Sequence, residues 1–158
     1  FRVSSSPEDT FVAGLSMGGY GAFLLALSQP QRYAAAGSLS GAMDVAARVR
    51  EGTDISHDMR LVMGDSPNSA EIAKADLFRL AEDVARSGKH APLLYQCCGT
   101  EDFLYEENVR FRRHVRELGL DVTYEEGPGA HEWGYWDEHV QHFLSLLQER
   151  RLIAPQTD

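Results

Sequence analysis

The serine at position 16 lies in a pattern that favours nucleophilic chemistry. It is the centre of the string GLSMG, which has the spacing G-x-S-x-G, between a short apolar run and a helical pattern. This arrangement is typical of a nucleophile elbow, a sharp turn from a strand into a helix that strains the serine and leaves room only for glycine at positions 14 and 18. Gly19 and Gly21 are predicted to extend the small surface where the helix meets the sheet. Ser16 is therefore predicted to attack carbonyl carbon.

A serine nucleophile needs a base and an acid that orients the base. Asp102 and His131 each follow a predicted strand, and the chain order Ser, Asp, His is that of an α/β-hydrolase rather than of chymotrypsin-like or subtilisin-like proteases. We predict Ser16 as the nucleophile, His131 as the general base and Asp102 as the acid that holds the imidazole in the right tautomer. The backbone N–H of Met17 is the predicted donor of one oxyanion hydrogen bond.

Other carboxylates compete with Asp102 for the acid position. Glu101 is its neighbour, and Asp65 and Asp76 are further candidates. Asp102 is preferred because it lies in the turn after the third predicted strand, where the chain order requires an acid. Glu101 is interpreted as a solvated surface acid, and Asp76 as a helix cap.

Five further histidines compete with His131. His57 lies in the irregular region and is a possible pocket residue. The other four are interpreted as surface residues: His90, His114, His139 and His142. The last two are three residues apart on one helix, but the pattern offers no third ligand, so no metal site is predicted. The pair His131-Glu132 begins like a zinc-protease motif, yet Tyr135 stands where the second histidine is required.

An aromatic group follows the predicted base, at Trp133, Tyr135 and Trp136. It is predicted chiefly to pack the last helix against the sheet, with an acyl or alcohol pocket as the alternative. The two cysteines, Cys97 and Cys98, are adjacent in an apolar strand and are interpreted as reduced, inert core thiols, which favours a cytoplasmic protein.

Strand-like and helix-like segments alternate along the chain, which indicates an α/β fold with a mostly parallel sheet and helices on both faces. The carboxyl ends of such strands meet at one edge, so the loops that carry the three candidate residues converge. Residues 42–68 have no clean period and are predicted to form short helices and loops over that edge. The expected strands are residues 10–14, 33–39, 92–98 and 121–125; the expected helices are 18–28, 69–87 in two pieces, 104–118, and a last helix with Val140, Phe143, Leu144 and Leu147 on one apolar face.

Composition sets limits on partners. The 158 residues are 43% apolar and 25% charged, as in an ordinary globular domain. A formal net charge of −9 with no basic stripe argues against nucleic acid. Apolar runs are far shorter than the roughly 20 residues that a bilayer requires, and no signal-peptide pattern is visible.

Four strings show a resemblance to a known family: GLSMGGYGAF, SLSGAMD, YQCCGTEDFLYEEN and YEEGPGAHEWGYWD. They resemble the serine carboxylesterases of the esterase D group, which includes tributyrin-type acetyl esterases and S-formylglutathione hydrolases, over residues 10–147. The resemblance implies an α/β-hydrolase fold and hydrolysis of short acyl esters or thioesters through an acyl-serine, with no metal or organic cofactor. It assigns the triad to the same Ser16, Asp102 and His131.

Members of that group carry further strands and a glycine-rich oxyanion loop before the elbow, where only a short segment stands here. Residues 1–158 are therefore expected to form a single partial domain, the C-terminal half of a hydrolase, with the other half encoded upstream or supplied by another chain. Without that half, the elbow strand is expected to be a bare, apolar sheet edge that favours association, including between copies of the chain. Two alternatives to an ester hydrolase stay open: a thioesterase of the S-formylglutathione type, and a catalytically silent fragment that acts as an association module.

Overall fold

A four-stranded parallel sheet organises the structure. The computed structural model describes residues 4–51 and 68–153. Within them the strand order is β1-β2-β3-β4, and each neighbouring pair is parallel, so all carboxyl ends lie at one edge. The strands are β1 (Phe11–Leu15), β2 (Ala35–Leu39), β3 (Leu93–Gly99) and β4 (Val122–Gly127).

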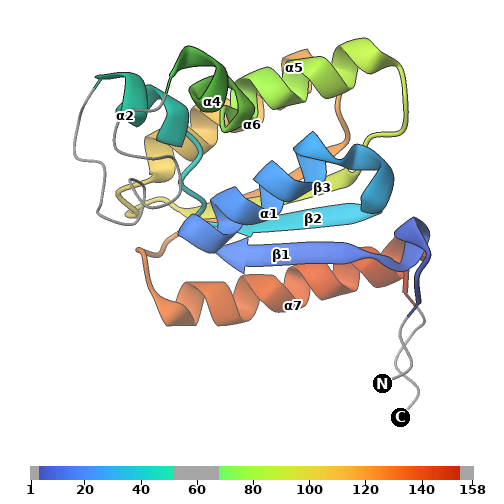
Figure 1. Ribbon diagram of the computed structural model, residues 1–158. Helices are drawn as coiled ribbons and strands as arrows, with labels where there is room; N and C mark the ends of the chain where they lie inside the picture. Colours follow the sequence, from blue (N-terminus) through green and yellow to red (C-terminus); the bar gives the residue numbers. More distant parts are fainter. Residues whose placement is uncertain (1–3, 52–67, 154–158) are drawn as a thin grey trace.

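Helices cover both faces of this sheet. Figure 1 shows α7 alone along one face and α1, α5 and α6 on the other. The predicted α/β fold, a parallel sheet with helices on both faces, is thereby confirmed, with helix and strand bounds that differ from the expected ones by a few residues. The helices are α1 (Met17–Ser28), α2 (Val45–Glu51), α4 (Ser69–Lys74), α5 (Leu77–Ser87), α6 (Tyr105–Glu117) and α7 (Trp133–Glu149), with 3₁₀ turns at Pro7–Asp9 and Pro30–Arg32.

Alternation along the strands sends neighbouring side chains into two separate cores. Leu94 packs in the cluster with α1, α5 and α6, whereas Leu93 and Tyr95 pack in the cluster with α7. Every residue of β2 and β3 is buried, as expected for central strands of a sheet covered on both faces. The two cores pack the sheet between its helices and hold in place the edge from which the site is built.

The helix cap predicted at Asp76 is confirmed. Its side chain accepts hydrogen bonds from the backbone N–H groups of Phe78 and Arg79, at 3.1 and 3.3 Å, and it also pairs with Arg50. Gly88 ends the helix in the left-handed conformation with φ of 62°. Asp76 is thus occupied as a cap and is not the acid of the site; the other candidate, Asp65, lies outside the described residues, as does His57.

The cysteines are free, buried thiols, as predicted. Cys97 faces the α7 core, and burial raises its pKa well above the ordinary range. Burial likewise raises the pKa of Cys98 to about 12. Both thiols stay protonated at neutral pH and are poor nucleophiles.

Two expectations about helix surfaces are wrong. Leu144 is 47% exposed because it lies about 60° around the helix from Leu147, at the border of the buried stripe. His114 is half-buried rather than exposed, since its Nε2–H donates to the carbonyl of Phe78 at 3.1 Å and its ring packs on the Phe78 ring. No helix among the described residues is long and apolar enough to cross a bilayer.

Candidate active site

Ser16 occupies the strained turn between β1 and α1. Its φ of 54° and ψ of −121° lie in a region that side-chain-bearing residues rarely adopt. The turn is held by the Ser16 N–H, which donates to the carbonyl of Leu39 at 2.9 Å, and by the Ser16 carbonyl, which accepts from Tyr20 N–H at 3.1 Å. The backbone therefore points the serine outward at the carboxyl edge of the sheet.

Close packing explains two of the four glycines. A Cβ on Gly14 would lie 2.3 Å from the carbonyl oxygen of Gly18, and one on Gly19 would lie 2.6 Å from Ser38 Oγ. The corresponding predictions for Gly18 and Gly21 are wrong within the described residues, where a Cβ at either position would meet nothing within 4 Å. At position 18 it is the backbone, not the missing side chain, that crowds Gly14.

The three predicted catalytic side chains lie in hydrogen-bond contact. His131 Nε2 is 2.9 Å from Ser16 Oγ, and His131 Nδ1 is 2.9 Å from Asp102 Oδ2. The Asp102 carboxylate is fully buried and its other oxygen accepts from the backbone N–H of Leu104 at 2.9 Å. With Nδ1–H donating to Asp102, Nε2 is left with a lone pair that accepts the Ser16 hydroxyl proton.

The loops that carry Asp102 and His131 are bonded directly to each other. Thr100 N–H donates to the Gly127 carbonyl at 2.9 Å, and Glu101 N–H donates to the Gly129 carbonyl at 3.0 Å. A Cβ on Gly99 would lie 2.1 Å from the Gly129 oxygen, so glycine permits this approach. These bonds set the distance between the acid and the base.

Glu101 contributes more than a solvated charge. It is exposed, as predicted, but its carboxylate accepts the backbone N–H of Gly129 in the loop before His131. That hydrogen bond lowers the pKa of Glu101 below its ordinary value. Sequence reasoning missed this positioning contact because it joins residues 28 apart in two loops.

The His131 ring is packed between two aromatic rings. Its centroid is 4.6 Å from that of Phe103 and 4.8 Å from that of Trp136, the second in edge-on geometry. Trp136 is itself fixed by its Nε1–H, which donates to Ser40 Oγ at 3.1 Å. Neither Phe103 nor Ser40 was predicted to belong to the site; the position of Phe103 directly after the candidate acid was the available signal.

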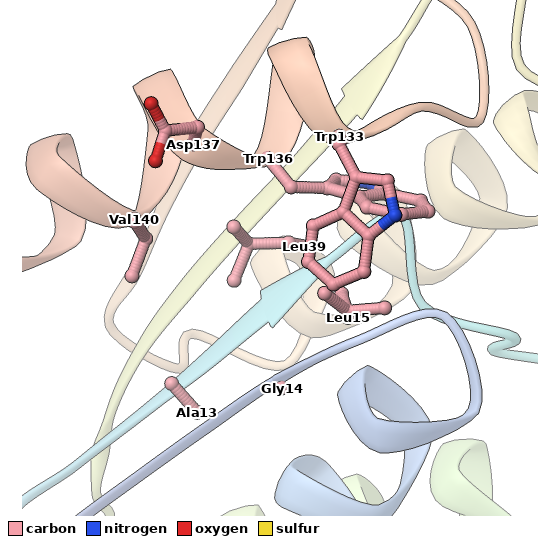
Figure 2. Close-up of a pocket in the computed structure, with 8 residues that line it drawn as sticks. All are labelled: Ala13, Gly14, Leu15, Leu39, Trp133, Trp136, Asp137 and Val140. Atoms are coloured by element: carbon pink, nitrogen blue, oxygen red, sulfur yellow. The ribbon is translucent and has the colours of Figure 1, made fainter.

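Exposed apolar side chains surround the triad. Met17, Phe103 and Trp133 are 42%, 75% and 74% exposed, and each lies within two residues of a candidate catalytic residue. An apolar hollow of about 270 Å³ lies beside them along β1, and Figure 2 shows Trp133 and Trp136 over Leu15 and Leu39 on its wall. The packing prediction therefore holds for Tyr135 and Trp136, which are buried, although Trp136 also lines the hollow; Trp133 is exposed and only lines it.

Met17 is the first residue of α1. The N–H groups of a helix's first turn have no intrahelical acceptor and carry the positive end of the helix dipole. The role of the Met17 N–H as an oxyanion donor stays a prediction, and its position at the start of α1, directly after Ser16, is compatible with that role.

The prediction of a surface position is confirmed for His142 and is wrong for His139, and the structure adds the third ligand-type side chain that the sequence pattern did not offer. His139 is buried, with 8% of its surface exposed, and Glu125 of β4 joins the two histidines so that one ligand atom of each lies within 4.8 Å of the others. No signal in the sequence links Glu125 to the last helix. The group is separate from the Ser16, Asp102 and His131 contacts.

Several known proteins are similar to this chain in sequence or in fold. The model of the Esterase family, described as "Putative esterase", matches residues 1–144. An acetyl esterase from Caldicellulosiruptor saccharolyticus is 31% identical over 94% of this chain and 58% of its own length. Two solved structures from Staphylococcus aureus, each 29% identical over 93% of this chain and 57% of their own, are the S-formylglutathione hydrolase FrmB, with a TM-score of 0.78, and the fluorophosphonate-binding serine hydrolase FphF, with a TM-score of 0.80. The chain thus spans little more than half the length of these relatives.

Proposed function

This chain belongs to the Esterase family, and we propose that Ser16, His131 and Asp102 form the catalytic triad of a serine carboxylesterase that hydrolyses short-chain acyl esters. The observation that carries the proposal is the unbroken chain of hydrogen bonds from the strained serine through the imidazole to a buried carboxylate, 2.9 Å at each step. This is the arrangement that activates a hydroxyl for acyl transfer.

The mechanism follows from the proton positions. As Ser16 Oγ attacks the ester carbonyl carbon, its proton passes to His131 Nε2, and the Asp102 carboxylate stabilises the resulting imidazolium. The negative charge on the carbonyl oxygen is stabilised by the Met17 N–H. His131 then returns the proton to the leaving alcohol, and a water molecule activated by the same imidazole releases the acid from the acyl-serine.

Apolar surroundings support a short acyl or alkyl group as the ligand. Met17, Phe103 and Trp133 present exposed apolar surface beside the triad, and such surface on a folded protein marks binding sites. The hollow along β1 is smaller than a site for a drug-sized ligand. Both features fit a small ester.

We further propose that this domain is completed at β1. Among residues 4–51 and 68–153 that strand has one sheet neighbour, β2, and the chain covers 58% of the length of its acetyl esterase relative. Further strands at this edge, from the same gene product or another chain, would bring the loop that supplies the second oxyanion donor.

A thioesterase activity is the second candidate, because FrmB, named as an S-formylglutathione hydrolase, is 29% identical to this chain. Glutathione carries two carboxylates that a basic clamp would recognise. Arg48 and Arg110, which lie in a hollow with Phe103, already pair with Glu107 and Asp44. The described surface therefore favours simple esters.

Steady-state kinetics of the full-length protein test the proposal. We expect kcat/KM for p-nitrophenyl acetate to be higher than kcat/KM for S-formylglutathione. A higher kcat/KM for S-formylglutathione would favour the thioesterase. Ser16→Ala should lower kcat by about 10⁶-fold, as loss of a triad nucleophile does elsewhere. Ser69→Ala, at an exposed helix start, is the matched control and should leave turnover unchanged. Full activity in Ser16→Ala would refute the serine mechanism, and a folded wild type without turnover would favour the silent association module.

A further inference from the structure

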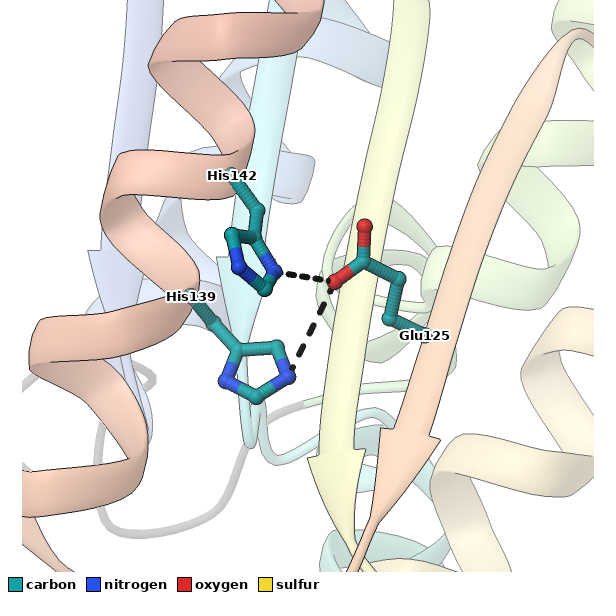
Figure 3. Close-up of side chains that lie close together, drawn as sticks. All are labelled: Glu125, His139 and His142. Carbon is teal, nitrogen blue, oxygen red and sulfur yellow. Dashed lines mark hydrogen bonds and ion pairs between the residues drawn. The ribbon is translucent and has the colours of Figure 1, made fainter.

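Three ligand-type side chains converge between β4 and α7, outside the triad. Glu125 comes from the strand, and His139 and His142 come from consecutive turns of the helix, as Figure 3 shows. Glu125 Oε2 is 2.7 Å from His142 Nδ1 and 3.7 Å from His139 Nε2. Two imidazoles and one carboxylate with a solvent-accessible fourth side are a common protein ligand set for Zn²⁺.

His139 is oriented as a metal ligand before any ion binds. Its Nδ1 is 2.8 Å from the backbone carbonyl of Tyr135, and because a carbonyl can only accept, Nδ1 carries the proton. Nε2 therefore holds a lone pair and points toward Glu125. Stacking on the Tyr135 ring, at 3.9 Å between centroids, fixes the ring plane. Histidines that bind zinc through one ring nitrogen usually donate a hydrogen bond from the other, often to a backbone carbonyl, and this bond orients the ring.

The carboxylate of Glu125 is also oriented by a hydrogen bond from a neighbouring residue. Tyr95 O–H donates to Glu125 Oε2 at 3.1 Å from the buried neighbouring strand. His142 is 44% exposed at its side chain, so the cluster is open to solvent for an ion and a bound water molecule. The three side chains line a surface hollow in which the Glu125 carboxylate sets the net negative charge, because the formal charges of the other four charged lining residues cancel. Those four are Glu126, Glu138, Arg112 and Arg116.

We propose that Glu125, His139 and His142 bind Zn²⁺ with a water molecule as the fourth ligand. Tetrahedral ligands at 2.0–2.1 Å from zinc lie about 3.3 Å apart, so the cluster need only open at the 2.7 Å pair and close elsewhere by side-chain rotation. His142 Nδ1, which donates to Glu125 without metal, must give up its proton when it binds the ion. The neutral ring then carries its proton on Nε2, so the change of tautomer frees Nδ1 for the ion without a net loss of protons.

The ion would act as a clamp. Glu125 precedes and His139 follows the segment that carries His131, so a shared ion ties the end of β4 to α7 across that loop. Zinc would therefore stabilise the folded protein and restrain the loop of the proposed base without touching substrate.

Calorimetric titration of metal-stripped, untagged full-length protein with Zn²⁺ tests the site. We expect one saturable site and a Tm that rises with the zinc concentration. Co²⁺ in place of Zn²⁺ should give the absorption bands of a four-coordinate ion with nitrogen and oxygen ligands.

Substitutions locate the ion. Glu125→Gln and His142→Ala should each weaken binding at least about tenfold, the smallest loss usual for even an outer partner of a metal. His142 is partly exposed, so its loss should leave the fold intact, and His90→Ala, at an exposed histidine elsewhere, should bind as the wild type does. Absence of saturable binding in the wild type, or an affinity equal to that of the wild type in both cluster variants, would overturn the proposal. Because the readout is binding and not hydrolysis, its failure leaves the proposed esterase function untouched.

Discussion

Two neighbouring carboxylates near His131 differ in what they do for its imidazole. Asp102 is buried and bonds Nδ1, whereas Glu101 is exposed and bonds the loop backbone at Gly129. Asp102→Asn would keep the bond to Leu104 N–H but offer His131 an amide donor, which forces the proton onto Nε2 and blocks acceptance from Ser16. We expect kcat to fall by about 10⁴-fold, the loss that this change causes in a serine protease triad.

Glu101→Gln is the matched control at the adjacent position. Its amide oxygen can still accept from Gly129, so we expect a loss of kcat below about tenfold, comparable to the loss of one hydrogen bond to a charged group. Hydrolysis of p-nitrophenyl acetate by both variants, with circular dichroism to check the fold, measures the difference. Equal losses in the two variants would contradict the assignment of Asp102 as the acid.

The buried thiols give a prediction that depends on pH. Burial raises the pKa of Cys98 from 9.0 to about 12, and that of Cys97 still further. At pH 9 we expect iodoacetamide to leave both cysteines of the folded protein unmodified and to alkylate both after unfolding in urea, as mass spectrometry would show. Since the folded state holds these protons more tightly, the free energy of unfolding should fall as the pH rises from 9.0 toward 12. Rapid alkylation of the folded protein would contradict this burial.

At the scale of elements, the elbow depends on one close backbone approach. A Cβ on Gly14 would collide with the Gly18 carbonyl at 2.3 Å, and backbone cannot move aside as a flexible side chain can. Gly14→Ala should therefore displace Ser16 and abolish activity or folding. Gly21→Ala, in the same helix with open space around the new methyl group, should leave kcat unchanged and raise the free energy of unfolding by about 0.5–1 kcal/mol. Urea unfolding and ester hydrolysis measure both, and an active, stable Gly14→Ala protein would refute the packing argument.

Elements whose signal is local could be predicted from the sequence. Residue spacing predicts the strand before Ser16 and the cap at Asp76. The alternation of strands and helices predicts that the strands are parallel, so that their carboxyl ends meet at one edge. Contacts between elements could not be predicted in this way. A spacing of three on α7 puts His139 and His142 on one face, but only the register of β4 against that helix shows that Glu125 meets them. The Glu101 contact with Gly129 likewise depends on how closely two loops approach.

At the scale of the whole molecule, β1 is the edge strand of the sheet that the described part of the chain forms. It pairs with β2 on one side, and Ala13 in its middle is exposed beside the apolar hollow (Figure 1, Figure 2). Unpaired strand edges promote association, and lysine on such an edge opposes it. We expect residues 1–158 expressed alone to associate as concentration rises, and Ala13→Lys to reduce this association. Size-exclusion chromatography with light scattering across a dilution series measures it; a monomer at every concentration would show that the edge is not a pairing surface.

The proposal as a whole requires that Ser16 be the atom that forms the covalent intermediate. Mass spectrometry of peptides after treatment of the full-length protein with a fluorophosphonate tests this most directly, because the probe phosphonylates only an activated serine. We predict one adduct, on Ser16, that is formed slowly in His131→Ala and is absent in Ser16→Ala. An adduct on another residue, or none on a folded wild-type protein, would contradict the assignment.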